Sequence, residues 1–333
     1  MRVLVVTGIY PTVQQPHLGT FVKTQVDSLI EAGLEVEIIH PGPGPTIVRY
    51  VQAVSQVFLK TLSGDFDIVK GYYGQWCVFA RLQWRTPVVA SFLGSDLLGV
   101  VSPKGSYNKQ GKMIIALSRW LCRWVDAAIV QSQGMKDVLS GGNVFVIPTG
   151  IDFNLFHPIP RAEARAYLGW EQDRYYVLFG NDPKRPVKNF ALAQAAIEHL
   201  KHRGISAELV VASGLSQTRL VQYINASNAL LLSSFHEGSP NVVKETMACN
   251  VPVVSTDVGD VAQVIGRTQG CRVCPHDPVA LAAGLEEALS RTEPTTGRAD
   301  IKHLESSVIA QQIIALFAQI TQKRGKRRTL SLS

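Results

Sequence analysis

The chain has 333 residues, of which 46% are hydrophobic, so it can bury one large core or, as we expect, two of ordinary size. Its five cysteines are an odd number, which favours free thiols over a disulfide framework. The net charge of +7 favours negatively charged partners. Neither a secretory leader nor an apolar run long enough to span a bilayer is recognisable, so we expect a cytoplasmic protein.

The first half of the chain has the pattern of a doubly wound parallel sheet. Val3 to Thr7 is a continuous apolar run rich in β-branched residues, Gly8 opens a long loop, and a helix from about Phe21 ends at Gly33. Further strands are expected at Leu34–Ile39, Asp67–Lys70, Pro87–Phe92, Ala127–Gln131 and Val144–Ile147. Ligands of such sheets bind outside the carboxyl ends of the strands. Since no G-x-G-x-x-G follows the first strand, a dinucleotide site is not indicated.

Three smaller patterns compete with this interpretation. Trp120 and Trp124 lie one turn apart on a predicted helix with basic residues, which suits a membrane interface, but we expect the pair to face the core. Cys271 and Cys274 form a C-x-x-C without a second ligand pair, so we expect two half-buried thiols and no metal. The sequence Asp65-Phe66-Asp67 precedes a strand and is interpreted as a turn.

A second domain is predicted after Pro148 and Gly150, which are typical of a linker. We expect strands at Tyr175–Phe179, Glu208–Ala212, Ala229–Ser233 and Val253–Ser255, and a closing helix with an apolar stripe from Val308 to Ile320. The predicted division is residues 1–150, 151–322 and a basic tail at 323–333.

The segment from Ser233 to Asp260 predicts strand end, turn, helix and second strand. Ser239 is a suitable N-cap, Pro240 suits the first helical position, and Asn250 suits a left-handed stop, so the helix should run from Pro240 to Cys249. The N-terminus of this helix is a ready anion site, with phosphate as the obvious candidate.

Two carboxylates flank this anion site, Glu237 before the helix and Glu245 about one turn inside it. Carboxylates are poor phosphate ligands, but they accept hydrogen bonds from the hydroxyls of sugars attached to phosphate. The pattern therefore indicates a nucleotide sugar, the alternative being a surface helix with two solvated glutamates.

The same residues resemble the donor-site signature of glycosyltransferase family 4, an E-x7-E motif followed by M-A-C-N-V-P-V-V-S-T-D. The resemblance implies an α/β protein of GT-B fold, with two Rossmann-like, doubly wound parallel-sheet domains facing across a cleft. It assigns Glu237 to the hydroxyls of the donor sugar and Glu245 to the ribose. Donor binding would also involve the segment facing the diphosphate, which consists of Gly238, Ser239, Pro240, Asn241 and Val242.

At the other positions of the family's motifs, this sequence matches only in part. Lys188 matches the lysine that clamps the diphosphate, whereas Asn181 fills the place of the usual arginine and Arg185 is expected to substitute for it. A solvated basic loop is the alternative interpretation of these cations.

In the first domain, Gly19 matches one glycine of the family's donor-facing pair, and Leu18 replaces the other. Leu93 stands where H-G-x-D has its histidine, so Asp96 should position the acceptor.

The resemblance implies metal-independent, retaining transfer of a hexose from a nucleotide diphosphate sugar to a glycan or lipid-linked acceptor. The most similar members build bacterial cell-surface polysaccharides of the teichuronic-acid type. No cofactor and no nucleic acid partner are implied, and the basic tail would hold the enzyme on the anionic inner face of the cell membrane. Two alternatives remain, a UDP-sugar 2-epimerase of the same architecture and a non-catalytic nucleotide-sugar binder.

Overall fold

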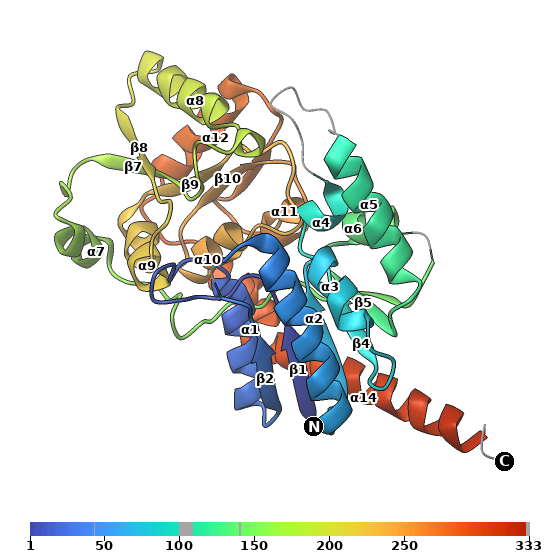
Figure 1. The fold of residues 1–333 in the computed structure, drawn as a ribbon. Helices are drawn as coiled ribbons and strands as arrows, with labels where there is room; N and C mark the ends of the chain where they lie inside the picture. Colours follow the sequence, from blue (N-terminus) through green and yellow to red (C-terminus); the bar gives the residue numbers. More distant parts are fainter. Residues whose placement is uncertain (43, 100–108, 140, 331–333) are drawn as a thin grey trace. The chain divides into compact units, whose positions relative to one another are not determined.

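The computed structural model describes residues 1–42, 44–99, 109–139 and 141–330, with backbone alone at 109–111 and 324–330 (Figure 1). It divides into two compact units, each with its own sheet. The first holds the described residues up to 150 and those from 306 on, and the second holds 151–305. No helix in the described ranges is long and apolar enough to cross a membrane.

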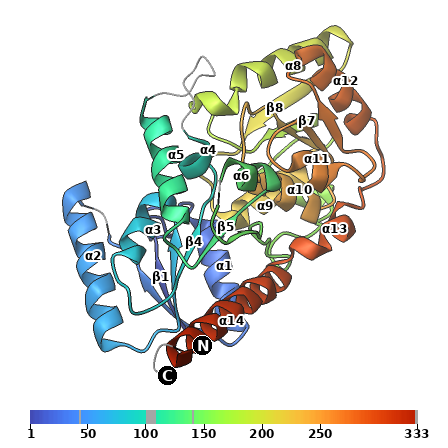
Figure 2. The same ribbon diagram turned by 90° about the vertical axis from the view of Figure 1, so that its right-hand side faces the viewer.

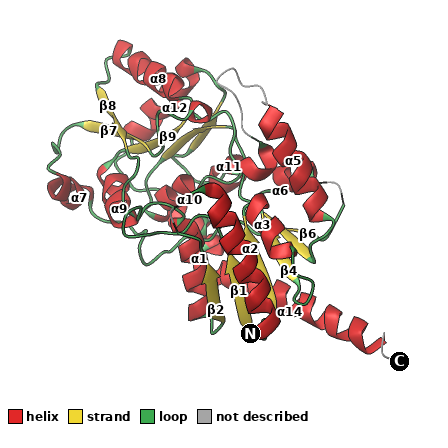
Figure 3. Ribbon diagram, in the orientation of Figure 1, coloured by secondary structure: helices red, strands yellow, loops and turns green. Residues whose placement is uncertain are grey.

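The first unit is a six-stranded sheet with the order β2-β1-β3-β4-β5-β6, and every pairing is parallel (Figure 3). Because β2 and β3 lie on opposite sides of β1, the strand order reverses between β1 and β3. The strands are β1 (Arg2–Val6), β2 (Glu35–Ile39), β3 (Ile68–Tyr72), β4 (Val88–Ser91), β5 (Ala127–Val130) and β6 (Val144–Val146). The helices are α1 (Thr20–Glu31), α2 (Thr46–Ser63), α3 (Gly74–Arg81), α4 (Ser95–Leu98), α5 (Lys109–Cys122), α6 (Gln133–Val138) and α14 (Ser306–Leu330).

The second unit is a five-stranded parallel sheet with the order β11-β10-β9-β7-β8, which reverses between β7 and β9. The strands are β7 (Tyr175–Phe179), β8 (Ala207–Val211), β9 (Ala229–Leu232), β10 (Val253–Thr256) and β11 (Arg272–Cys274). The helices are α7 (Arg161–Leu168), α8 (Phe190–His202), α9 (Gln217–Ala226), α10 (Asn241–Ala248), α11 (Val261–Ile265), α12 (Pro278–Leu289) and α13 (Gly297–Asp300), with 3-10 turns η1 (Pro186–Lys188) and η2 (Lys302–Leu304).

The predicted fold class, two doubly wound parallel α/β units, is confirmed. The apolar runs that we expected to form strands do so, and they are buried on both faces. In β3, β4, β5 and β9 every residue is buried. The closing helix α14, which the sequence-based division placed in the second domain, groups with the first unit because it packs on α1.

The prediction that Trp120 and Trp124 face the core is wrong, because 51% and 56% of their surfaces are exposed. The buried side of α5 is formed instead by smaller side chains, Ser118, Leu121 and Cys122. In the C-x-x-C, Cys274 is fully buried and Cys271 only partly so, and both are free thiols.

A lysine lies inside the first core. Lys70 of β3 is completely buried, donates to the Ser91 hydroxyl at 2.8 Å, and lies over the rings of Tyr72 and Phe317. Burial lowers the pKa of Lys70 to about 7, so above this pH the native state holds mostly the neutral amine.

This burial predicts a pH-dependent stability. In the unfolded chain the lysine pKa returns to about 10.4, so the unfolded state binds more protons and the free energy of unfolding should rise with pH between about 7 and 10. Lys70→Met should flatten this slope and raise the free energy of unfolding at pH 6 by on the order of 1–3 kcal/mol. Urea unfolding from pH 6 to 10 measures both effects, with exposed Lys201→Met as the control. Parallel profiles for wild type and Lys70→Met would contradict the assignment.

Candidate active site

The predicted donor residues gather in the second unit where its strand order reverses. Three loops leave the carboxyl ends of neighbouring parallel strands there: residues 180–189 after β7, 233–240 after β9 and 257–260 after β10. Because parallel strands end at one edge of the sheet, these loops converge, as ligand-binding loops do in doubly wound folds.

Two glycines let these loops approach each other. A Cβ added to Gly180 would lie 2.4 Å from Cγ2 of Val242, so a side chain there would force the Val242 side chain to move. Gly259 has φ +61°, and a Cβ there would lie 2.7 Å from the carbonyl oxygen of Gly238. The close packing of the three loops therefore requires glycine at both positions.

Hydrogen bonds join the loop after β9 to the loop after β7. The Ser233 hydroxyl donates to the carbonyl oxygens of Lys188 and Asn189 at 3.1 and 3.0 Å, and the Phe235 N–H donates to that of Val187 at 2.9 Å. Asn189, with φ 50°, turns the chain from η1 into α8. These bonds fix the backbone on both sides of Lys188.

Lys188 and Glu237 meet across this junction. The Lys188 ammonium lies 2.6 Å from Oε1 of Glu237, which also accepts from the Ser234 hydroxyl at 2.7 Å. The two side chains are only 9% and 13% exposed, so the pair is largely desolvated. Oε2 of Glu237 accepts no hydrogen bond from the described residues, which leaves it available to a ligand hydroxyl.

Helix α10 begins one residue later than expected. Pro240 is its N-cap, and the Ser239 hydroxyl does not cap the helix but donates to Oδ2 of Asp260 at 2.6 Å. The predicted cap is therefore wrong, because a carboxylate from the loop after β10 competes for the hydroxyl. The left-handed stop at Asn250 is confirmed by its φ of 58°. The Val243 N–H donates to the carbonyl oxygen of Pro240 at 3.2 Å, whereas the N–H groups of Asn241 and Val242 have no backbone acceptor within the described residues. Free amides at a helix N-terminus favour a bound anion.

Three buried polar atoms at this site lack partners among the described residues: Nδ2 of Asn181, Oδ1 of Asn241 and Oδ1 of Asp260. They come from the loop after β7, the start of α10 and the loop after β10. A buried polar atom without a hydrogen bond costs free energy. Their presence on all three loops indicates that a bound polar ligand or water completes the site.

Glu245 lies within α10 and is 9% exposed. Burial raises the pKa of its carboxyl to about 7, which the Lys244 cation partly opposes. Burial likewise lowers the pKa of Lys244 to about 8, against the attraction of Asp260 and Glu245. The carboxylate of Glu245 accepts no hydrogen bond from the described chain, so it too is available to a ligand.

The remaining predicted residues are placed differently. Arg185 is exposed at the start of η1, and its side chain makes no hydrogen bond or ion pair within the described residues. Gly19 caps α1 with φ 73°, and a Cβ there would lie 2.8 Å from the carbonyl carbon of Ile9, so it shapes the loop after β1.

Asp96 lies in the first unit and is only 6% exposed. Its carboxylate accepts hydrogen bonds from the N–H groups of Leu93, Gly94 and Gly74 at 2.9–3.2 Å. Asp96 therefore joins the loop after β4 to the start of α3, and its oxygens are already engaged.

Sequence reasoning missed two charged residues of the second unit, Lys244 and Asp260. Lys244 is completely buried in α10, and Asp260 is 7% exposed. The one signal in the sequence was a lysine that directly follows two valines in the predicted helix. Its electrostatic partner Asp260 comes from another loop, which the sequence pattern does not connect to it.

Comparison with known families matches both halves of the chain. Residues 18–155 match "Glycosyltransferase Family 4", and residues 163–291 match "Glycosyl transferases group 1".

Similar proteins agree with these matches. The teichuronic acid biosynthesis glycosyltransferase TuaC of Bacillus subtilis is 26% identical, covering 88% of this chain and 89% of its own. A D-inositol 3-phosphate glycosyltransferase of Paenarthrobacter aurescens is 23% identical, covering 87% of this chain and 88% of its own.

Solved structures share the fold. Sucrose-phosphate synthase from Thermosynechococcus elongatus superposes with a TM-score of 0.74 at 19% identity, covering 97% of this chain and 99% of its own. Anabaena HepE in complex with UDP and glucose superposes with a TM-score of 0.70 at 16% identity, covering 95% and 99%. With one of these models matched on each half of the chain, the chain has the two domains of a glycosyltransferase, a family 4 domain followed by a group 1 domain.

Proposed function

We propose that the chain transfers a sugar, with retention of configuration, from a nucleoside diphosphate sugar to a glycan or lipid-linked acceptor in the assembly of a surface polysaccharide. The observation that carries the proposal is the buried Lys188–Glu237 pair beside the N-terminus of α10, with the unpartnered carboxylate of Glu245 one turn inside that helix. The similarity to TuaC supports the polysaccharide assignment.

The diphosphate of the donor would lie at the first turn of α10, from Gly238 to Val242. There the helix amides and the Lys188 ammonium can stabilise the charge that develops on the leaving group, so the proposed reaction uses no metal ion. Arg185 is close in sequence and exposed, so it can add a second cation once a ligand is bound.

The two glutamates would bind different parts of the donor. Oε2 of Glu237 can accept a hydroxyl of the sugar while Oε1 holds Lys188 and Ser234. Glu245 can accept the ribose hydroxyls, which would supply the hydrogen bonds that its buried carboxylate lacks in the described chain.

The acceptor would bind on the first unit, residues 1–150, and the donor on residues 151–322. Asp96 would act as a positioning residue, because its three backbone hydrogen bonds set the loop after β4. A cytoplasmic enzyme acting on a lipid-linked acceptor would work at the inner membrane face, where the basic tail from Lys323 would add to the attraction for anionic lipids. The tail's side chains beyond Lys323 lie outside the described residues.

Incubation with a panel of nucleotide sugars, with and without membrane extract, tests the reaction class. We expect release of nucleoside diphosphate to depend on the extract, and the sugar to appear in a lipid or glycan fraction. A donor converted to its 2-epimer without an acceptor would identify an epimerase instead. Donor binding without any turnover would identify a non-catalytic binder.

Substitutions at the three donor residues should have different kinetic effects. Lys188→Ala should lower kcat by about 10²-fold, with a smaller change in donor affinity, because its partner gains charge in the transition state. Glu245→Ala should weaken nucleoside diphosphate binding by about 1.5–3 kcal/mol. Glu237→Gln should leave that binding nearly unchanged and lower turnover, since its partner is the sugar.

Calorimetric titration with nucleoside diphosphate, combined with steady-state kinetics, measures these effects. Glutamine is used at position 237 because alanine would leave the buried Lys188 cation unpaired. The neighbouring exposed Lys184→Ala is the control. Equal losses of nucleoside diphosphate affinity in the Glu237 and Glu245 variants would show that the two carboxylates do not divide the donor.

Nucleotide binding should also release protons near neutral pH. The pKa of Glu245 is raised to about 7 by burial, and hydroxyl groups donating to the carboxylate favour its ionised form. Affinity should therefore rise from pH 6 to pH 8. Calorimetry with UDP in buffers of different ionisation enthalpy measures the release, which Glu245→Gln should reduce. Because Lys244, Asp260 and the phosphate are common to both proteins, identical proton release would contradict the role of Glu245.

A further inference from the structure

Helices α2 and α5 of the first unit expose an unusual amount of apolar surface. Within that unit α3 lies between them and contacts both (Figure 2). We use the term α2–α5 face for the exposed side of these helices and of the turn after α3. Its central residues are Val51, Phe58, Leu82, Trp84, Trp120 and Trp124, which are 41–67% exposed.

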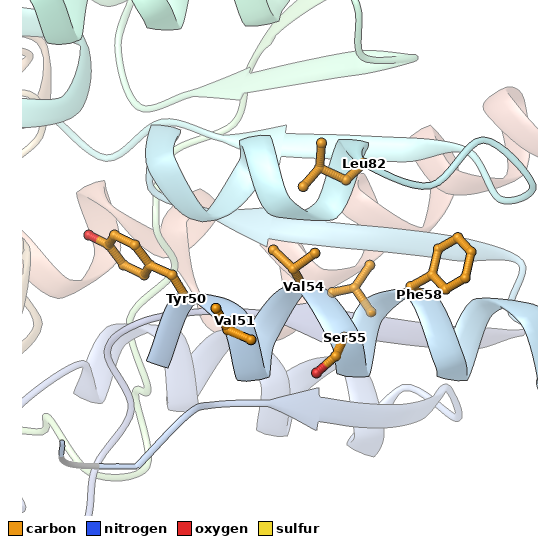
Figure 4. A pocket seen from close by; sticks show the side chains of 7 residues that line it. Tyr50, Val51, Val54, Ser55, Phe58 and Leu82 are labelled. Carbon is orange, nitrogen blue, oxygen red and sulfur yellow. The ribbon is translucent and has the colours of Figure 1, made fainter. Parts of the chain in front are cut away.

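On α2 the apolar residues border a shallow groove of about 430 Å³ (Figure 4). Val51, Val54 and Phe58 follow one another at helical spacing along one side of α2, and Leu82, directly after α3, lines the opposite side. The groove is open to the surface and almost wholly apolar, so it suits a hydrocarbon group better than a polar ligand.

On α5 the apolar residues Met113, Leu117 and Trp120 form a stripe with helical spacing, and Trp124 continues it in the turn directly after the helix. The rings of Trp120 and Trp124 contact each other, with centroids 5.8 Å apart. Tryptophan combines a large apolar ring with a polar N–H, which suits the boundary between hydrocarbon and water.

Contacts join the two helices into one surface. The Phe58 ring contacts the Trp84 ring, with centroids 6.3 Å apart, and Arg85 donates to the carbonyl oxygen of Leu62 at 3.0 Å. Arg81 at the end of α3 donates to the carbonyl oxygen of Trp124. The exposed apolar groups of α2, α3 and α5 are therefore held in fixed relation to one another.

The charge on this face has one sign. Helices α2, α3 and α5 and residues 82–86 contain no aspartate or glutamate. Asp65 and Asp126 follow the ends of α2 and α5, and Glu37 of β2 pairs with Lys60 of α2. The exposed basic residues are Arg85, Lys112, Arg119 and Arg123. None of these four forms a salt bridge within the described chain, so their charge is available to an external anion.

We propose that the α2–α5 face binds the surface of an anionic lipid bilayer, with the tryptophans and the α2 groove in the headgroup and upper acyl region and the basic side chains on lipid phosphates. Apolar burial and attraction to anionic lipids together drive such interfacial binding. A second copy of the chain fits less well, because a two-fold contact through this face would bring the same unpaired cations together.

Flotation of the full chain with vesicles of phosphatidylcholine, alone or mixed with phosphatidylglycerol, tests the proposal. We expect strong partition onto the anionic vesicles only. Lys112→Gln with Arg123→Gln should lower the partition coefficient about 5-fold for each charge removed. Trp120→Ser with Trp124→Ser should lower it about 10-fold or more, because two half-exposed indoles lose their lipid contact. Binding should survive deletion of residues 324–333.

Matched controls come from the second unit. Tyr167→Ser removes an aromatic ring that is 71% exposed, and Lys201→Gln removes an exposed cation, and neither should change the partition. Partition that is unchanged in both double variants and lost on deleting residues 324–333 would overturn the proposal in favour of the tail. A dimer in light scattering that dissociates in the tryptophan variant would overturn it in favour of a second copy.

Tryptophan fluorescence adds a second readout. Trp84, Trp120 and Trp124 lie on the face, whereas Trp76 is buried and Trp170 belongs to the other unit. Phospholipids brominated on the acyl chains should quench the emission of wild type but not that of the triple Trp→Ser variant. Absence of quenching in wild type bound to vesicles would place the bilayer elsewhere on the protein. Vesicle binding needs no donor or acceptor, so the result is independent of the proposed reaction.

Discussion

The ion pair between Lys188 and Glu237 joins the loops after β7 and β9 at the point where the second sheet reverses its strand order. Both charges are largely desolvated, so each would be costly to leave without the other. The hydrogen bonds of Ser233 and the close packing of Gly180 on Val242 hold the backbone around the pair. These contacts fix the start of α10 relative to the loop after β7.

Hydrogen-bond satisfaction separates the carboxylates that shape the fold from those available to ligands. Asp96 is buried, but three backbone N–H groups satisfy it, so its effect is on the loop that it holds. Glu245 is equally buried, yet it has no hydrogen-bond partner in the described chain, and burial raises the pKa of its carboxyl to about 7. Oδ1 of Asp260 and Nδ2 of Asn181 are likewise buried without a hydrogen-bond partner among the described residues. Helix α10 and the loops after β7 and β10 therefore contain unmet hydrogen-bonding capacity that a polyhydroxylated, phosphorylated ligand can meet.

The sequence predicted the parallel strands and the approximate extent of α10, because apolar runs, proline and asparagine act locally on the backbone. It also singled out Lys188 and Glu237, which the fold brings into contact. The prediction failed where contacts between residues far apart in the sequence determine the structure. Ser239 looks like an N-cap until Asp260, from the next loop, takes its hydroxyl. Trp120 and Trp124 were expected in the core as large apolar side chains. Helical spacing alone does not show which face of α5 is buried. The place of α14 in the first unit likewise depends on its packing against α1, which no local pattern encodes.

Helix α2 connects the exposed apolar surface of the first unit with the point where its sheet reverses. Its outer side carries Val51 and Phe58, whereas Arg49 near its start donates to the carbonyl oxygen of Gly8, in the loop directly after β1, at 3.2 Å. The Arg49 guanidinium also lies over the Trp76 ring, and Gly8 has no room for a side chain beside that ring. The loop after β1 is thus packed directly against the helix that borders the groove. In the proposed reaction, a lipid-linked acceptor would therefore place its hydrocarbon anchor on the outer side of α2 and its sugar head at the strand ends.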